Sequence, residues 1–225
     1  MLVFALLATA NSGGYRYGVG DQAFYIPATE LRLTPDAFPR DRALIASQAR
    51  LTIVDEALAA SARITGADLP TLFLALYALT LVTIALGADR LARALGGSPW
   101  MSAAFGLLLT MRHRIAKTGA NTLEGYMHPR MLAFGVGLFA LTAALERRWR
   151  WTVALWALAA VIHPTTALWF GVLIGGGLVA DALVRARGGR VLAVMLVTSG
   201  VLLAAGMLGV GDLLVRHLPA DRRMD

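Results

Sequence analysis

Residues 69–87 read LPTLFLALYALTLVTIALG, and this stretch decides the fold class of the chain. It carries no charged side chain, and a helix needs about 20 predominantly apolar residues to cross the hydrocarbon core of a membrane. Pro70 stands near its start, where a helix tolerates proline, and Arg90 and Arg93 follow its end. The sequence therefore predicts a membrane-spanning helix at this place.

Apolar runs recur downstream, at residues 99–111, 131–145, 151–162, 167–183 and 191–210. The chain has 225 residues, of which 57% are hydrophobic and 16% charged, whereas soluble domains are about 25% charged. The hydrophobic residues are spread over many segments, which argues against one buried core. We expect an all-α, polytopic transmembrane helix bundle over residues 69–215, with about six or seven spans, and a polar tail over residues 216–225.

The N-terminal segment 1–10, MLVFALLATA, is apolar but too short to span a membrane. Two interpretations stay open. The segment is the C-terminal part of a first transmembrane helix that begins upstream, or it is a signal-like core that ends in the small residues 8–10. The second interpretation lacks the positive charge that precedes such a core.

Residues 11–68 form a long polar loop of mixed charge. Within it, Leu44, Leu51 and Leu58 recur every seven residues, with Ile45 and Val54 beside them. This pattern predicts one amphipathic helix over residues 41–65. The helix lies on the membrane surface or packs against the rest of the loop.

Short clusters of arginine follow several apolar runs, at positions 90/93, 147/148/150 and 185/187/190. Short loops rich in Lys and Arg stay on the cytoplasmic side of a membrane. If His163 and Pro164 form a turn, the three clusters share that side, and the long first loop is external. The net charge of +7 lies in these clusters, so we expect membrane lipid as a partner and no nucleic acid. The chain has no cysteine, which excludes disulfides and thiolate metal sites.

The first candidate site lies in residues 14–27, GYRYGVGDQAFYIP. Gly18 and Gly20 allow a sharp turn just before Asp21, which presents a carboxylate beside aromatic residues such as Tyr25. Such a carboxylate can act as a general base or bind a metal. The alternative is that Asp21 caps the following helix and the tyrosines form an interfacial belt.

A second candidate site is the segment 121–130, NTLEGYMHPR, which places Glu124, His128 and Arg130 at the entrance of an apolar run. An arginine there can pair with phosphate, or the segment is a solvated loop with an anchoring arginine. His163 lies between two apolar half-helices, where an ionisable residue indicates function. It could instead only cap the backbone that Pro164 interrupts.

The order of four motifs adds a family resemblance. They are Gly-x-x-Asp-x-x-x-Tyr-x-Pro-Ala from Gly18, Phe-Pro-Arg-Asp from Phe38, Glu-Gly-Tyr-x-x-Pro-Arg from Glu124, and His-Pro-Thr-Thr from His163. Together they resemble the bacterial integral membrane proteins of the GT-C glycosyltransferase superfamily, particularly its less characterised members. The resemblance covers most of the chain.

The resemblance implies transfer of a sugar from a polyprenyl-phosphate carrier to an acceptor at the external face of the bacterial plasma membrane. It implies that Asp21 is the catalytic base. It also implies that Arg130 binds the phosphate of the carrier, with Arg16 as the second candidate for this role. Substrate-binding roles fall to residues that share these motifs: Tyr25, Glu124, His128 and His163.

Two departures from the family pattern limit this expectation. Many members carry two adjacent acids where Gln22 follows Asp21 here, so a divalent metal is not predicted and no cofactor is expected beyond the lipid-linked sugar donor. Members also have more spans, so the chain would be a fragment, a truncated gene product or one half of the fold. The alternative is a non-enzymatic polytopic membrane protein, such as a transporter-like or assembly subunit. A transporter is expected to show two broken helices in matching positions, and the sequence has one clear break, at His163 and Pro164.

Overall fold

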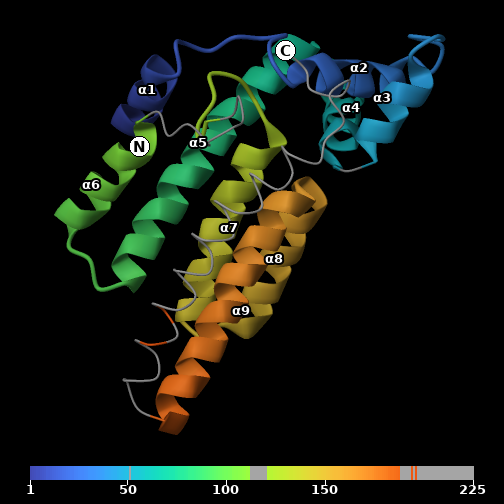
Figure 1. Cartoon of the computed structure of the whole chain (residues 1–225). Helices are drawn as coiled ribbons and strands as arrows, with labels where there is room; N and C mark the ends of the chain where they lie inside the picture. Colours follow the sequence, from blue (N-terminus) through green and yellow to red (C-terminus); the bar gives the residue numbers. More distant parts are fainter. Residues whose placement is uncertain (51, 112–120, 188–193, 195, 197–225) are drawn as a thin grey trace, which may run out of the picture. The chain divides into compact units, whose positions relative to one another are not determined.

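The computed structural model describes residues 1–50, 52–111, 121–187, 194 and 196 (Figure 1). These residues form helices and contain no β-strand, which confirms the all-α fold class. The helices are α1 (Leu2–Asn11), α2 (Gln22–Leu33), α3 (Arg42–Ala49), α4 (Val54–Thr65), α5 (Leu69–Ala94), α6 (Pro99–Thr110), α7 (Pro129–Leu145), α8 (Trp149–Ile162) and α9 (Pro164–Arg187). The chain divides into two compact units, Met1–Val172 and Leu173–Asp225, and the first unit holds the candidate site.

Two helices are long and apolar enough to cross a membrane: α5, and α9 over Pro164–Arg185. The N-terminus of α5 is capped by Asp68, whose Oδ1 accepts the Thr71 N–H at 3.1 Å. In the most apolar 18-residue stretch of each helix, only 33% of α5 and 17% of α9 is buried within the protein. Most of this apolar surface therefore faces outward, unlike the surface of a core helix in a soluble protein.

The remaining apolar runs form helices that are shorter than a full span. These are α1 with 10 residues, α6 with 12, α7 with 17 and α8 with 14. Among the described residues there are thus two candidate spans, where the sequence predicted about six or seven. Of the predicted last span, 191–210, only residues 194 and 196 are described, and the polar tail lies outside the described residues.

Within the first unit, α5 packs on α7, and α7 packs on α8, with α1 and α6 beside α5 (Figure 1). Glycines let α5 and α7 approach closely. A Cβ on Gly135 would lie 3.1 Å from the Ile84 backbone nitrogen, and a Cβ on Gly87 would lie 3.1 Å from the Gly135 carbonyl oxygen. The fully buried side chains include Phe73, Ile84 and Met131. This core fixes the ends of α5 and α7 at which the candidate site is built.

The segment predicted as one amphipathic helix is in fact two helices, α3 and α4, separated by a break to which the non-helical residues 50, 52 and 53 belong, while Leu51 lies outside the described residues. Thr52, Ile53 and Val54 are consecutive β-branched residues, which restrict side-chain rotamers in a helix. The break contacts the end of α8. The Ile53 N–H donates to the Val161 carbonyl at 3.1 Å, and Thr52 Oγ1 donates to the Ile162 carbonyl at 2.8 Å. These carbonyls lack helical partners because α8 ends at Ile162, so the break satisfies them.

The predicted faces of that segment also need correction. Leu44 is exposed, whereas Ile45 and Leu58 are buried. An amphipathic helix carries its acids on the exposed face, yet Asp55 is 1% exposed and pairs with Arg32 Nε of α2 at 3.1 Å. Both α3 and α4 pack on α2, which agrees with the interpretation of helices packed within the loop.

Candidate active site

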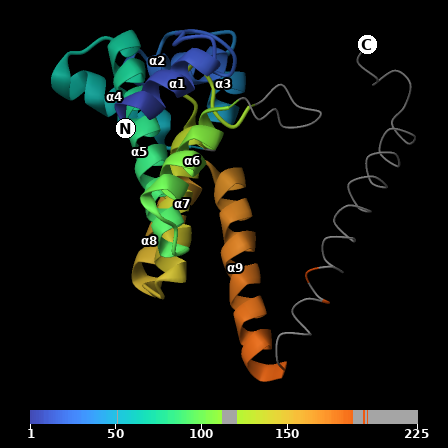
Figure 2. The same cartoon turned by 90° about the vertical axis from the view of Figure 1, so that its left-hand side faces the viewer.

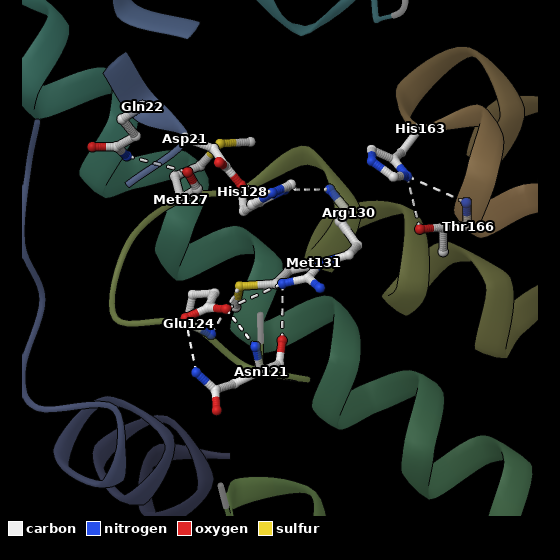
Figure 3. Close-up of polar contacts among 10 residues, drawn as sticks. All are labelled: Asp21, Gln22, Asn121, Glu124, Met127, His128, Arg130, Met131, His163 and Thr166. Atoms are coloured by element: carbon white, nitrogen blue, oxygen red, sulfur yellow. Dashed lines mark hydrogen bonds and ion pairs between the residues drawn. The ribbon is translucent and has the colours of Figure 1, made fainter. Parts of the chain in front are cut away.

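Two His-Pro pairs begin helices α7 and α9. His128 is the N-cap of α7, and its Nδ1 accepts the Arg130 N–H at 3.0 Å. His163 precedes α9, and its Nδ1 accepts the Thr166 N–H at 3.2 Å (Figure 3). The centroids of the two imidazole rings lie 5.9 Å apart. Similar capping arrangements therefore hold two histidines that lie together, although α7 and α8 separate them in the sequence.

Asp21 stands at the N-cap position of α2, after a turn in which Gly18 and Gly20 have φ of 79° and 57°. Its carboxylate makes no capping hydrogen bond, so the capping interpretation of this side chain is wrong. Instead, Asp21 Oδ2 lies 2.7 Å from His128 Nε2. The Asp21 side chain is still 57% exposed, so the carboxylate remains open to a ligand.

The hydrogen bonds of His128 fix its role. Nδ1 accepts a backbone N–H, so the ring proton lies on Nε2 and is donated to Asp21. Both ring nitrogens are then occupied, and His128 orients the carboxylate. The hydrogen bond from His128 lowers the pKa of Asp21, and the charge of Arg130 acts in the same direction. Asp21 is therefore ionised at neutral pH.

His163 offers the complementary group. Its Nδ1 also lies 2.9 Å from Thr166 Oγ1, so the ring proton is on Nε2, and Nε2–H is the donor that remains. Burial, together with the nearby His128 and Arg130, lowers the pKa of His163 to about 4. At neutral pH the ring is an uncharged hydrogen-bond donor.

A cavity of about 310 Å³ lies beside these groups. The start of α2, the break between α3 and α4, and the junction of α8 and α9 supply its lining residues, which are Asp21, Phe24, Tyr25, Thr52, His163, Pro164 and Thr165. Burial and the negative charge of Asp21 raise the pKa of Tyr25 to about 12, so the phenol keeps its proton. A carboxylate, neutral donors and aromatic rings in one cavity suit a hydroxyl-rich ligand.

The segment that contains Glu124 and Arg130 is a buried network and not a solvated loop. Arg130 Nη2 donates to Glu124 Oε1 at 3.2 Å and to the Asn121 carbonyl at 2.9 Å, and Glu124 Oε1 accepts the Asn121 N–H at 2.6 Å. Figure 3 shows the guanidinium turned towards Glu124 and Asn121. Arg130 does not line the cavity, and its role as a phosphate ligand stays a prediction.

Arg16 joins this region through its backbone, because its N–H donates to the Gly125 carbonyl at 2.7 Å. Its side chain is exposed and is not among those that line the cavity. The structure thus brings Asp21, Tyr25, His128 and His163 together, and the Arg130 N–H joins His128 to the buried network of Arg130 and Glu124. Arg16 is the predicted site residue whose side chain stays apart.

Gln22 has a structural role at the site that the sequence did not reveal. It is fully buried, its Oε1 accepts the Gly18 N–H at 2.7 Å, and its Nε2 donates to the Met127 carbonyl at 3.2 Å. A carboxylate could not make the second bond, because an ionised acid only accepts. The amide thus ties the Asp21 turn to the segment before α7, which gives a structural reason for Gln at this position.

Thr52 is the second such residue, since it lines the cavity from a break that the heptad pattern concealed. The consecutive β-branched residues 52–54 were the available signal. Among the described residues, no group of three or more potential metal-ligating side chains is present.

Comparisons with known proteins add no relative to this description. No family model matches the chain, and no curated protein or solved structure matches it. The fold and the site define a helical protein with two candidate membrane spans and a cavity that holds a carboxylate oriented by a histidine.

Proposed function

We propose that this chain is a membrane glycosyltransferase of the GT-C type, or the N-terminal half of one. It would transfer a sugar from a polyprenyl-phosphate carrier to an acceptor hydroxyl at the external face of a bacterial plasma membrane. The observation that supports this proposal is the Asp21 carboxylate, which His128 holds at 2.7 Å beside a cavity lined by Phe24, Tyr25 and His163.

In the proposed reaction, the acceptor hydroxyl donates a hydrogen bond to Asp21. Its oxygen attacks the anomeric carbon as the proton passes to the carboxylate. The bond from the anomeric carbon to the phosphate oxygen breaks, and its electron pair leaves with the polyprenyl phosphate. Asp21 then releases the proton to water. A concerted transfer of this kind does not need a strongly basic carboxylate, because the hydroxyl becomes acidic as the new bond forms.

The donor phosphate needs hydrogen-bond donors in the same cavity. Thr165 stands at the second position of α9 and lines the cavity, and N–H groups at a helix N-terminus favour anions. The Nε2–H of His163 is a second donor. Because burial keeps His163 neutral, it would bind a phosphate oxygen without pairing permanently with Asp21.

The distribution of cations supports an external location for the site. In the first unit, α5 ends and α8 begins at the end opposite the cavity (Figure 1). Arg90, Arg93 and Arg148 lie at that end, and Trp151 there is 64% exposed. Arginine-rich short loops remain cytoplasmic, and tryptophans favour the membrane interface. The opposite end of the unit, with Asp21, would then face outward.

The direct test uses the full chain in proteoliposomes with a panel of radiolabelled polyprenyl-phosphate monosaccharides, and it measures labelled product together with released polyprenyl phosphate. Asp21→Asn should reduce turnover by about 100-fold or more, because general-base catalysis contributes that much. Asp36→Asn is the matched control, since it removes an exposed acid of the same loop that lies outside the cavity.

Equal turnover of the Asp21→Asn variant and the wild-type protein would refute the catalytic assignment. Absence of both donor binding and transfer across the whole panel would favour the non-enzymatic alternative, a transporter-like or assembly subunit.

A further inference from the structure

A second cavity, also of about 310 Å³, lies between α2 and α3 and is separate from the Asp21 cavity. Its floor is apolar and its rim is basic. The floor consists of Ala28, Leu31, Ile45 and Ala49, and the exposed rim consists of Arg32, Arg42 and Arg50 together with Ala46. We call these eight residues the α2–α3 groove. No acidic residue lines it.

The three arginines of the groove differ in the charge that they offer. Arg32 is paired with Asp55 at 3.1 Å and also with Glu56, so its charge is already compensated. Arg42 and Arg50 are exposed, and neither forms an ion pair with another described residue. They stand at opposite ends of α3. An apolar floor between two uncompensated cations is complementary to an anionic amphiphile.

The groove lies close to the start of a candidate membrane span. Figure 1 and Figure 2 both show α2, α3 and α4 gathered at the end where α5 begins, and α4 contacts α5. If α5 crosses the membrane, the groove is near the level of the lipid headgroups. At that level, arginines attract anionic headgroups and apolar side chains contact the first acyl carbons.

From this arrangement, we propose that the α2–α3 groove binds an anionic phospholipid of the surrounding membrane. The phosphate would lie between Arg42 and Arg50, and the glycerol and upper acyl carbons would lie on the floor formed by Ala28, Ile45 and Ala49. This site requires that α5 spans the membrane, and it does not depend on the proposed glycosyl transfer at Asp21.

The experiment is a native mass spectrometry titration of the full chain in detergent with phosphatidylglycerol and, separately, with phosphatidylcholine. Each cation near a membrane surface contributes about a five-fold preference for anionic lipid, so Arg42→Gln with Arg50→Gln should weaken phosphatidylglycerol binding about 25-fold. Binding of phosphatidylcholine should not change. Arg40→Gln is the matched control, because Arg40 is an exposed arginine of the same loop outside the groove.

A second variant, Ala46→Trp, fills the groove from an exposed position and leaves every arginine in place. It should abolish the preference for phosphatidylglycerol. A loss caused by Arg40→Gln as large as that caused by Arg42→Gln would show only general surface attraction and overturn the proposal. Competition by free glycerol phosphate at equal concentration would overturn it too, because the ligand would then be a soluble phosphate. Sugar transfer that persists in the groove variants would show that lipid binding in the α2–α3 groove and glycosyl transfer at Asp21 are independent.

Discussion

Gly20→Ala tests whether the turn before Asp21 is built as the structure describes. The residue has φ of 57°, and a Cβ there would lie 2.7 Å from Tyr126 Oη and 2.9 Å from Tyr126 Cζ. The left-handed backbone costs an alanine about 1–2 kcal/mol. The contact with the ring costs about 1–3 kcal/mol more, because the packed side chain has to move. We expect a total loss of about 2–5 kcal/mol in the free energy of unfolding.

Gly18→Ala separates these two costs. Gly18 also has positive φ, at 79°, but a Cβ there would meet nothing within 4 Å. This variant should lose only the backbone term of about 1–2 kcal/mol. The measurement is denaturant unfolding of the purified chain in micelles, followed by far-ultraviolet circular dichroism.

A cycle with Tyr126→Ala completes the test. Removal of the ring should relieve the Gly20→Ala variant of its contact cost and leave the Gly18→Ala variant unchanged. Equal losses for Gly18→Ala and Gly20→Ala, with no coupling of either to Tyr126→Ala, would refute the close approach of Tyr126 to the Asp21 turn.

Substitutions at three further positions test other contacts. Thr52→Val should cost about 1–3 kcal/mol, because it leaves the Ile162 carbonyl without its donor; Thr52→Ser should restore most of this loss in the same unfolding assay. Burial, with a contribution from Glu56, raises the pKa of Asp55 from 3.8 to about 6, so the folded state holds a proton that the unfolded state releases. The unfolding free energy of the wild-type protein should therefore fall as pH rises from 3.8 to about 6. Asp55→Asn should remove this fall, and the same pH dependence in the variant and the wild-type protein would contradict the burial of Asp55. The pKa of His163 is lowered from 6.5 to about 4, so the unfolded state binds the proton more tightly and stability falls as pH drops through this window. His163→Asn should flatten that fall, and NMR titration of the imidazole should find it neutral at pH 6.

Part of the candidate site was predictable because its residues lie in short motifs. Gly18 and Gly20 before Asp21 indicated a turn, and the turn exists. His163 and Pro164 indicated an interruption between two apolar half-helices, since a residue before proline is disfavoured in a helix. Helix α8 ends before this pair and α9 begins at Pro164.

Other features could not be predicted, because local patterns support more than one arrangement. The heptad of Leu44, Leu51 and Leu58 fits a continuous helix, but the exposed end of α8 needs donors, and the break at Thr52 and Ile53 supplies them. The burial of Asp55 against Arg32 depends on how α2 packs on α4, which a local sequence pattern does not encode. The number of spans was likewise overstated among the described residues, since apolar runs of 10–17 residues resemble parts of spans in composition.

The sequence by itself determined the helical class, the long apolar helix α5 and the residue types of the site, because these follow from composition, periodicity and turn chemistry within a few neighbouring residues. Only the tertiary structure decided that Asp21 pairs with His128 and does not cap α2. Those residues are 107 positions apart, and their meeting depends on the packing of α5 and α7 and on Gln22, which joins the Asp21 turn to the Met127 carbonyl. Long-range contacts of this kind depend on how whole helices pack, and no local pattern encodes that packing.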